Sequence, residues 1–173
     1  MKKLNEWLYL RSLRKINDRP TGFPHWDRVR SILLLYESDI MEKNPTIKKI
    51  VAELQSEDKE VITLGYVQRK DVSSANLPQS RILGQKDFNW FGMPKADIQH
   101  DLMKRRYDLM LDLSLTPILA LKYMAMYVRA DFKAGRNLGE GVNNLMIDLP
   151  SDAGREDLFQ ELVRYLKMIK SVD

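Results

Sequence analysis

The sequence contains no cysteine and only two histidines among its 173 residues. The lack of cysteine excludes disulfide bonds, thiolate metal sites and a cysteine nucleophile. His25 and His100 have no second histidine at a metal-ligand spacing, so we predict no transition-metal site. The Gly-x-Ser-x-Gly turn of many hydrolases is also absent. These absences remove several enzyme classes before any fold is considered.

A long apolar run is missing as well. The best candidate for a membrane span, residues 107–128, contains Asp108, Asp112, Pro117 and Lys122, whereas a span needs roughly 20 mostly apolar residues. The amino-terminal segment does not resemble a signal peptide, because basic residues interrupt the apolar core that such a signal needs. We therefore expect a soluble, cytoplasmic protein without a transmembrane segment.

Positive charge is concentrated near the amino terminus. Residues 1–30 carry eight Lys/Arg and three Asp/Glu, a net charge of +5, and the rest of the chain carries −1. Because the basic residues do not spread over the fold, nucleic-acid binding is not favoured. The apolar residues of 3–17 lie loosely on one helical stripe, which predicts a helix that docks on the domain or on a second copy of it. Peripheral contact of residues 1–17 with an anionic membrane is the alternative.

From residue 29 onward, apolar runs alternate with helical patterns. Short apolar runs at 31–36, 60–67, 107–113 and 144–149 predict buried strands, and helical periodicity between them predicts crossover helices. This alternation indicates an α/β fold, a three-layer, doubly wound, mostly parallel sheet of the Rossmann-like type. Asn44 followed by Pro45 predicts the start of one of the helices.

The chain divides into two parts on this interpretation. Residues 1–22 form the amino-terminal basic helix and its linker, and residues 23–173 form a single α/β domain. A closing helix is expected over residues 154–170.

Polar side chains follow several of the predicted strands. In open α/β sheets, ligands bind beyond the carboxyl ends of the strands, and this rule selects candidate residues without an alignment. Such carboxylates could hold Mg²⁺ together with phosphate oxygens, or act as a general base. They could equally bond loop amides and helix amino termini. The ligand-binding candidates are Glu37, Asp39, Asp112, Ser114 and Asp148, and Asp39 is the candidate catalytic residue.

A glycine-rich segment, residues 135–141, resembles a phosphate-binding loop at first sight. Its glycines follow one predicted strand and lead into another, whereas a phosphate loop leads into a helix. We interpret it as a connecting turn. Arg136 within it remains a candidate for contact with an anion.

The stretch KDFNWFGMP, residues 86–94, places three aromatic rings where glycine and proline predict a loop. Phe88, Trp90 and Phe91 could fold down as a plug over a part of the core that no helix covers. Alternatively, Trp90 and Phe91 could form a stacking platform or a patch for a protein partner.

The whole chain resembles an uncharacterised family of small proteins from Bacteroidetes. The resemblance rests on the basic amino-terminal helix, on residues 86–94, on YDLMLDL at 107–113 and on ADFKAGR at 130–136. It implies a domain of unknown function and adds no activity.

Residues 29–149 are also similar to the amino-terminal Rossmann-like half of heptosyltransferase-type glycosyltransferases. The shared features are the spacing from Asp39 to Pro45, the strand 107–113 and the small-residue segment 130–135. By this resemblance Asp39 would occupy the place of the catalytic base. Ser38 stands where that family has glycine.

Two functions follow as expectations. The first is a non-catalytic binding or interaction module, acting as a homodimer or with a protein partner. The second is a Mg²⁺-dependent enzyme of phosphoryl or glycosyl transfer that uses the carboxylates at the carboxyl edge of the sheet. The sequence names no cofactor for either.

Overall fold

The computed structural model describes residues 1–16, 22–23, 25–38, 44–70 and 77–170. Strands and helices alternate along most of the chain, as the apolar pattern predicts. Two 3₁₀ helices, η1 (Trp26–Arg28) and η2 (Gln85–Asp87), accompany the regular elements. The regular elements are α1 (Lys2–Leu13), β1 (Ser31–Glu37), α2 (Pro45–Ser56), β2 (Glu60–Val67), β3 (Ser80–Gly84), α3 (Ala96–Met103), β4 (Arg106–Asp112), α4 (Leu119–Tyr127), β5 (Arg129–Arg136), β6 (Leu145–Ile147) and α5 (Arg155–Met168).

Six of these strands form one sheet in the order β3-β2-β1-β4-β5-β6, and every neighbouring pair is parallel. This order confirms the predicted Rossmann-like α/β class, with the sheet wholly rather than mostly parallel. The chain changes direction across the sheet between β1 and β4. That switch point is the place where folds of this kind usually bind a ligand.

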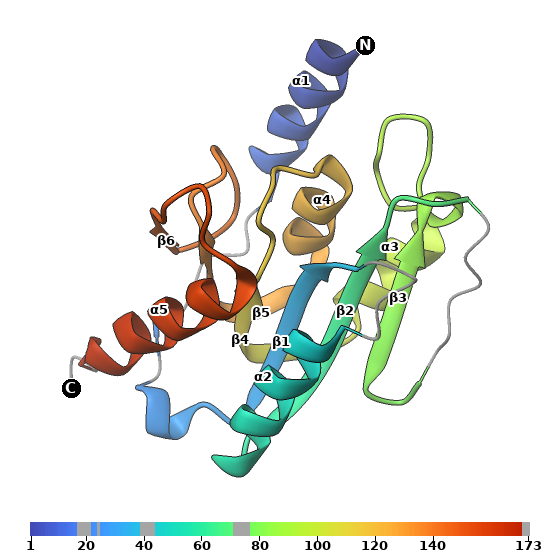
Figure 1. Cartoon of the computed structure of the whole chain (residues 1–173). Helices are drawn as coiled ribbons and strands as arrows, with labels where there is room; N and C mark the ends of the chain where they lie inside the picture. The colour runs from blue at the N-terminus through green and yellow to red at the C-terminus, as the bar shows by residue number, and fades with distance from the viewer. Residues whose placement is uncertain (17–21, 24, 39–43, 71–76, 171–173) are drawn as a thin grey trace.

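Helices cover both faces of the sheet (Figure 1). Helices α2 and α5 pack on one face, where Ile32 and Leu34 of β1 are buried. Helices α3 and α4 pack on the other, against Leu33 and Leu35 of the same strand. The continuous apolar run of β1 is explained by this double cover, because alternate side chains enter two different cores.

Helix α1 lies apart from these layers, at the carboxyl end of the sheet, with its amino terminus pointing away from the domain (Figure 1). It contacts α4 through Tyr9, whose ring meets that of Tyr123 edge to face at 5.2 Å between centroids. None of the helices in the described part of the chain combines the length and the apolar character that a membrane span requires.

Several boundaries differ from the sequence prediction. Helix α1 ends at Leu13, four residues before the predicted end at residue 17. Helix α4 begins at Leu119, and the hydroxyl of Thr116, three residues before it, donates to Glu37. Asn44 does precede α2, but in a left-handed conformation (φ +44°) without a side-chain cap, and its amide donates to Ser38 Oγ at 3.0 Å.

Candidate functional site

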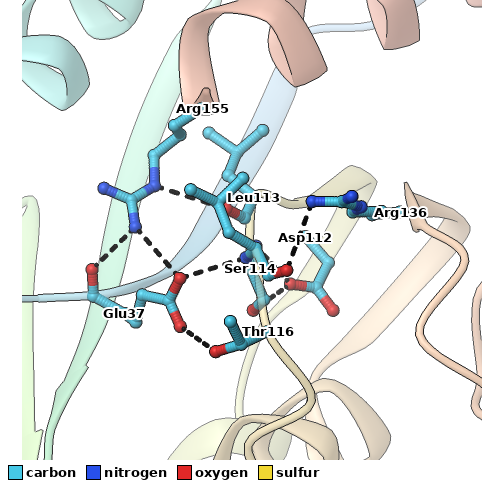
Figure 2. Close-up of polar contacts among 8 residues, drawn as sticks. Glu37, Asp112, Leu113, Ser114, Thr116, Arg136 and Arg155 are labelled. Carbon is cyan, nitrogen blue, oxygen red and sulfur yellow. Dashed lines mark hydrogen bonds and ion pairs between the residues drawn. The ribbon is translucent and has the colours of Figure 1, made fainter. Parts of the chain in front are cut away.

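Glu37 and Asp112 end two neighbouring strands, β1 and β4, at the switch point of the sheet. The carboxylate of Glu37 reaches across to the segment that follows β4. It accepts the backbone N–H of Leu115 at 3.1 Å and the hydroxyl of Thr116 at 3.0 Å (Figure 2). Both carboxylate oxygens of Glu37 therefore have a donor from within the protein.

Arg155, the first residue of α5, projects over the same switch point (Figure 2). Its Nη2 donates to the carbonyl oxygen of Glu37 at 3.0 Å and lies 3.6 Å from the Oε1 of the same residue. Its Nε donates to the carbonyl oxygen of Leu113 at 3.3 Å. The guanidinium thus joins the ends of β1 and β4 at the switch point, the region where a ligand of this fold usually binds.

Asp112 is held by the residue two positions along the chain. Its Oδ1 accepts the backbone N–H of Ser114 at 3.0 Å and the Ser114 hydroxyl at 2.5 Å. Burial raises the pKa of Asp112 above its ordinary value, and hydrogen bonds from Ser114 and the Asn143 amide oppose that rise. The Asp112 side chain thus closes a short turn with Ser114, the kind of local hydrogen bonding that Asp side chains often make in loops.

Gly135 of β5 allows this arrangement. A Cβ atom at that position would lie 2.6 Å from Asn143 Nδ2 and 3.0 Å from the carbonyl oxygen of Asp112. The glycine is therefore required for the close approach of β5, Asp112 and the loop that carries Asn143.

A cavity of about 30 Å³ adjoins Asp112 and Ser114, with Arg136 and Asn143 in its wall and Tyr9 of α1 beside it. Among the described residues the hydroxyl of Tyr9 has no hydrogen-bond partner, and burial raises the pKa of Tyr9 to about 12. Since a water molecule needs roughly 10–15 Å³ of such space, the cavity has room for about two or three waters.

The guanidinium of Arg136 donates hydrogen bonds to three backbone carbonyl groups. Its Nη1 donates to the carbonyl oxygen of Leu115 at 3.3 Å, and its Nη2 donates to those of Leu149 and Pro150 at 3.2 and 3.1 Å. These bonds tie together the segments that follow β4 and β6. A structural role therefore accounts for the residue that the sequence offered as an anion contact.

The remaining candidates lie elsewhere or outside the described residues. Asp148, after β6, accepts the side-chain N–H of Asn137 at 3.0 Å, so it bonds within the β5–β6 region. Asp39 lies outside the described residues. Among the residues that the structure describes, no group of three or more His, Asp or Glu side chains is arranged to hold a metal ion. The structure thus brings Glu37, Asp112 and Ser114 to one edge, with Asp148 bonded separately.

A larger groove, of about 350 Å³, lies between α2 and the β2–β3 edge of the sheet. Its wall is mostly apolar and includes Ile47, Val51, Val61 and Ile82, with Lys48 at its border. No residue selected as a site candidate lines it.

The aromatic stretch is divided between core and surface. Phe88 is 8% exposed and meets Tyr66 edge to face, with 5.2 Å between ring centroids. Trp90 is 77% exposed and Phe91 is also exposed. The expected plug is therefore Phe88 alone, and the next two rings lie on the surface.

Sequence reasoning missed Arg155, although a signal for it was present. The positive end of a helix dipole lies at the amino terminus, so a cation in the first turn is unfavourable without a partner. Arg155 follows Gly154 at the predicted start of the closing helix. An arginine at that place indicates a carboxylate or carbonyl group opposite, which here is Glu37.

Comparisons with known proteins identify a family and no activity. A family model described as a family of unknown function (DUF6913) matches residues 2–169. No curated protein and no solved structure matches the chain. The expectation that the chain belongs to a family without an assigned activity is confirmed. The similarity to heptosyltransferase-type enzymes has no support from these comparisons.

Proposed function

We propose that this chain, which belongs to the family of unknown function DUF6913, is a non-catalytic interaction module. The observation that carries the proposal is the position of Arg155 at the switch point between β1 and β4. A module of this kind uses the α/β fold as a rigid support and binds through its surface.

The bonding at the switch point supports this interpretation. A ligand entering there would have to displace the Arg155 guanidinium from two carbonyl oxygens and from the vicinity of the Glu37 carboxylate. Each buried group left without its partner costs about 1–3 kcal/mol. Binding energy would be consumed in opening the site before any contact with the ligand is made.

Within this proposal the partner is a macromolecular surface, with a homodimer as one form of it. The division into an amino-terminal segment (1–22) and an α/β domain (23–173) is part of the same proposal. A cytoplasmic location is compatible with it, since the chain has no cysteine.

The second candidate is a Mg²⁺-dependent enzyme of phosphoryl or glycosyl transfer. One observation favours it: Asp112 is a buried carboxyl group with a raised pKa at the carboxyl end of a central strand, and such groups are enriched at active sites. Asp39 would supply the catalytic base in that case. This candidate requires Arg155 to leave the switch point when substrate binds.

A thermal-shift screen separates the two candidates. The purified chain is tested with nucleotides, nucleotide sugars and sugar phosphates, with and without Mg²⁺. A ligand at a hundred times its Kd adds about 2.7 kcal/mol of stability, which for a chain of this size is a rise in Tm of roughly 5–10 °C. The interaction module predicts no such rise with any of these compounds.

The enzyme predicts a Mg²⁺-dependent rise that is lost in Asp112→Asn and Asp39→Ala and kept in Asp148→Asn. Asp148 is a suitable control because its bond to Asn137 lies away from Arg155. Such a result would overturn the proposal of a non-catalytic module.

A further inference from the structure

Helix α1 has apolar residues on two opposite sides. Tyr9 faces the domain and is almost fully buried against Tyr123. Leu4 and Trp7, three residues apart, share the other side, where Trp7 is 52% exposed and Arg11 lies over its ring at 5.4 Å. A surface helix usually keeps one apolar stripe for the core and polar residues opposite. The second apolar side of α1 therefore has no partner within the described part of the chain.

The loop after η2 presents a second pair of exposed apolar side chains, the rings of Trp90 and Phe91. Its backbone is bonded internally around Asn89, whose Oδ1 accepts the N–H groups of Phe91 and Met93 at 2.9 and 3.1 Å. In addition, the N–H of Asn89 donates to the carbonyl oxygen of Met93 at 2.8 Å, and that of Gly92 donates to Asn89 at 3.0 Å. A loop whose backbone N–H groups are already hydrogen-bonded enters an apolar medium at a lower free-energy cost than a loop whose N–H groups bond only water.

The two features lie at the same end of the molecule. Both α1 and the loop after β3 are found beyond the carboxyl ends of the strands (Figure 1). Met93 of the loop and Leu10 and Leu13 of α1 pack into one apolar cluster with Leu119 of α4. We name Leu4, Trp7, Trp90 and Phe91 the aromatic surface.

Basic residues predominate on the helix side of the aromatic surface. Glu6 is the single acidic residue in positions 1–16, which contain five Lys or Arg residues. On the loop side, the exposed Lys86 and Lys95 are balanced by Asp87 and Asp97. The positive charge of α1 is therefore complementary to an anionic partner and repels the same helix of a second copy.

We propose that the aromatic surface docks on the headgroup region of a membrane that contains anionic lipids. Tryptophan prefers the boundary between headgroups and acyl chains, and Lys and Arg are drawn to anionic lipids. The anchors stand on two separate projections, a helix and a loop tip, which suits insertion at a few points into a fluid layer. This inference rests on the interaction role proposed above and names the partner.

The test uses the full chain and sedimentation with vesicles. One set of vesicles is phosphatidylcholine alone, and the other is an equal mixture of phosphatidylcholine and phosphatidylglycerol. The chain is expected to pellet with the anionic vesicles and to remain in solution with the neutral ones. Added salt should weaken the binding, because screening reduces the attraction between exposed charges and the surface.

Three single variants locate the contact. Trp7→Ser and Trp90→Ser should each weaken binding to the anionic vesicles by about 10-fold or more, the effect expected from removing a large inserted apolar side chain. Tyr165→Ser is the matched control, because Tyr165 is an exposed ring on α5 outside the aromatic surface. It should bind as the unmodified chain does. All three side chains are exposed, so the fold should be retained.

Three results would overturn the proposal. The chain could fail to pellet with anionic vesicles, pellet equally with neutral ones, or bind unchanged in both tryptophan variants. A dimer in gel filtration that Trp90→Ser abolishes, without vesicle binding, would identify a second copy as the occupant instead. None of these results bears on the interaction module if the thermal-shift screen shows no rise in Tm with any of the small molecules. The membrane proposal and the interaction module can therefore fail separately.

Discussion

Two regions at the carboxyl end of the sheet use their side chains in opposite ways. At the switch point, Glu37, Thr116 and Arg155 turn their polar groups inward and bond one another or nearby backbone. In the aromatic surface, Trp7 and Trp90 turn apolar rings outward. The polar groups at the switch point are bonded within the protein, whereas the rings of the proposed docking region are exposed.

This contrast is the basis of both proposals. Satisfied polar groups stabilise a fold and have little left to offer a ligand. Exposed apolar rings contribute little to the core, and the proposed docking gives the rings of the aromatic surface a role. The following predictions test the contrast in order of decreasing effect.

The aromatic stretch gives the largest expected difference between neighbouring residues. Phe88→Ala should lower the free energy of unfolding by about 3 kcal/mol, because a buried ring is lost and a cavity remains. Trp90→Ala should change it by less than about 0.5 kcal/mol, since its ring is exposed. Urea denaturation of both variants measures the difference. Equal losses would show that Trp90 belongs to the core, which would remove half of the aromatic surface.

At the switch point, Arg155→Met should lower the free energy of unfolding by about 2 kcal/mol, because the carbonyl oxygens of Glu37 and Leu113 lose their donor. Arg164→Met is the control, since Arg164 makes an exposed ion pair with Glu161 on the surface of α5. The control should unfold as the unmodified chain does. A tolerated Arg155→Met would mean that the switch point is not closed by this residue.

Gly135→Ala should cost about 1–2 kcal/mol through overpacking, because a Cβ there meets Asn143 and the backbone of Asp112. At Gly139, in the loop after β5, an added Cβ would meet only Lys122 Nζ, at an ordinary contact distance of 3.8 Å, so any cost of Gly139→Ala comes from the positive φ of +89°. Denaturation curves and a crystal structure of Gly135→Ala would show whether the loop with Asn143 moves. An unchanged loop and unchanged stability would contradict the close packing described here.

Asp112 supplies a change in the pH dependence of stability. Its folded pKa is raised by burial, so the folded state holds the proton more tightly than the unfolded state. The free energy of unfolding therefore falls as pH rises above the ordinary value of 3.8 toward the folded pKa. The variant Asp112→Asn lacks this titration. The difference in free energy of unfolding between the variant and the unmodified chain should therefore shift in favour of the variant as pH rises over the same interval. A pH-independent difference would show that Asp112 is ionised in the fold without penalty.

Much of the fold could be predicted from local pattern. The apolar run at 31–36 became β1 because its two faces enter two cores, and the runs at 60–67 and 107–113 became β2 and β4 for the same reason. The strand order could not be predicted, since it depends on which strands meet across the sheet rather than on any one segment.

The site was harder to predict than the fold. Glu37 and Asp112 were selected because they stand at strand ends, and the structure places both at one edge of the sheet. The same rule could not show that Arg155, more than a hundred residues later in the chain, bonds Glu37. Three adjacent rings also look equivalent in sequence. Their separation depends on the turn around Asn89, whose side chain bonds Phe91 and Met93 and sends successive residues in different directions.

The most direct test of the central claim is a ¹H–¹⁵N spectrum of the three tryptophan indoles, recorded during titration with bicelles that contain anionic lipid. Trp26 is 3% exposed and its indole donates to Glu57 at 2.7 Å, so it serves as an internal reference. We predict that the signals of Trp7 and Trp90 shift and that the signal of Trp26 does not. Three unchanged signals, or a shift of Trp26 equal to the others, would contradict the account.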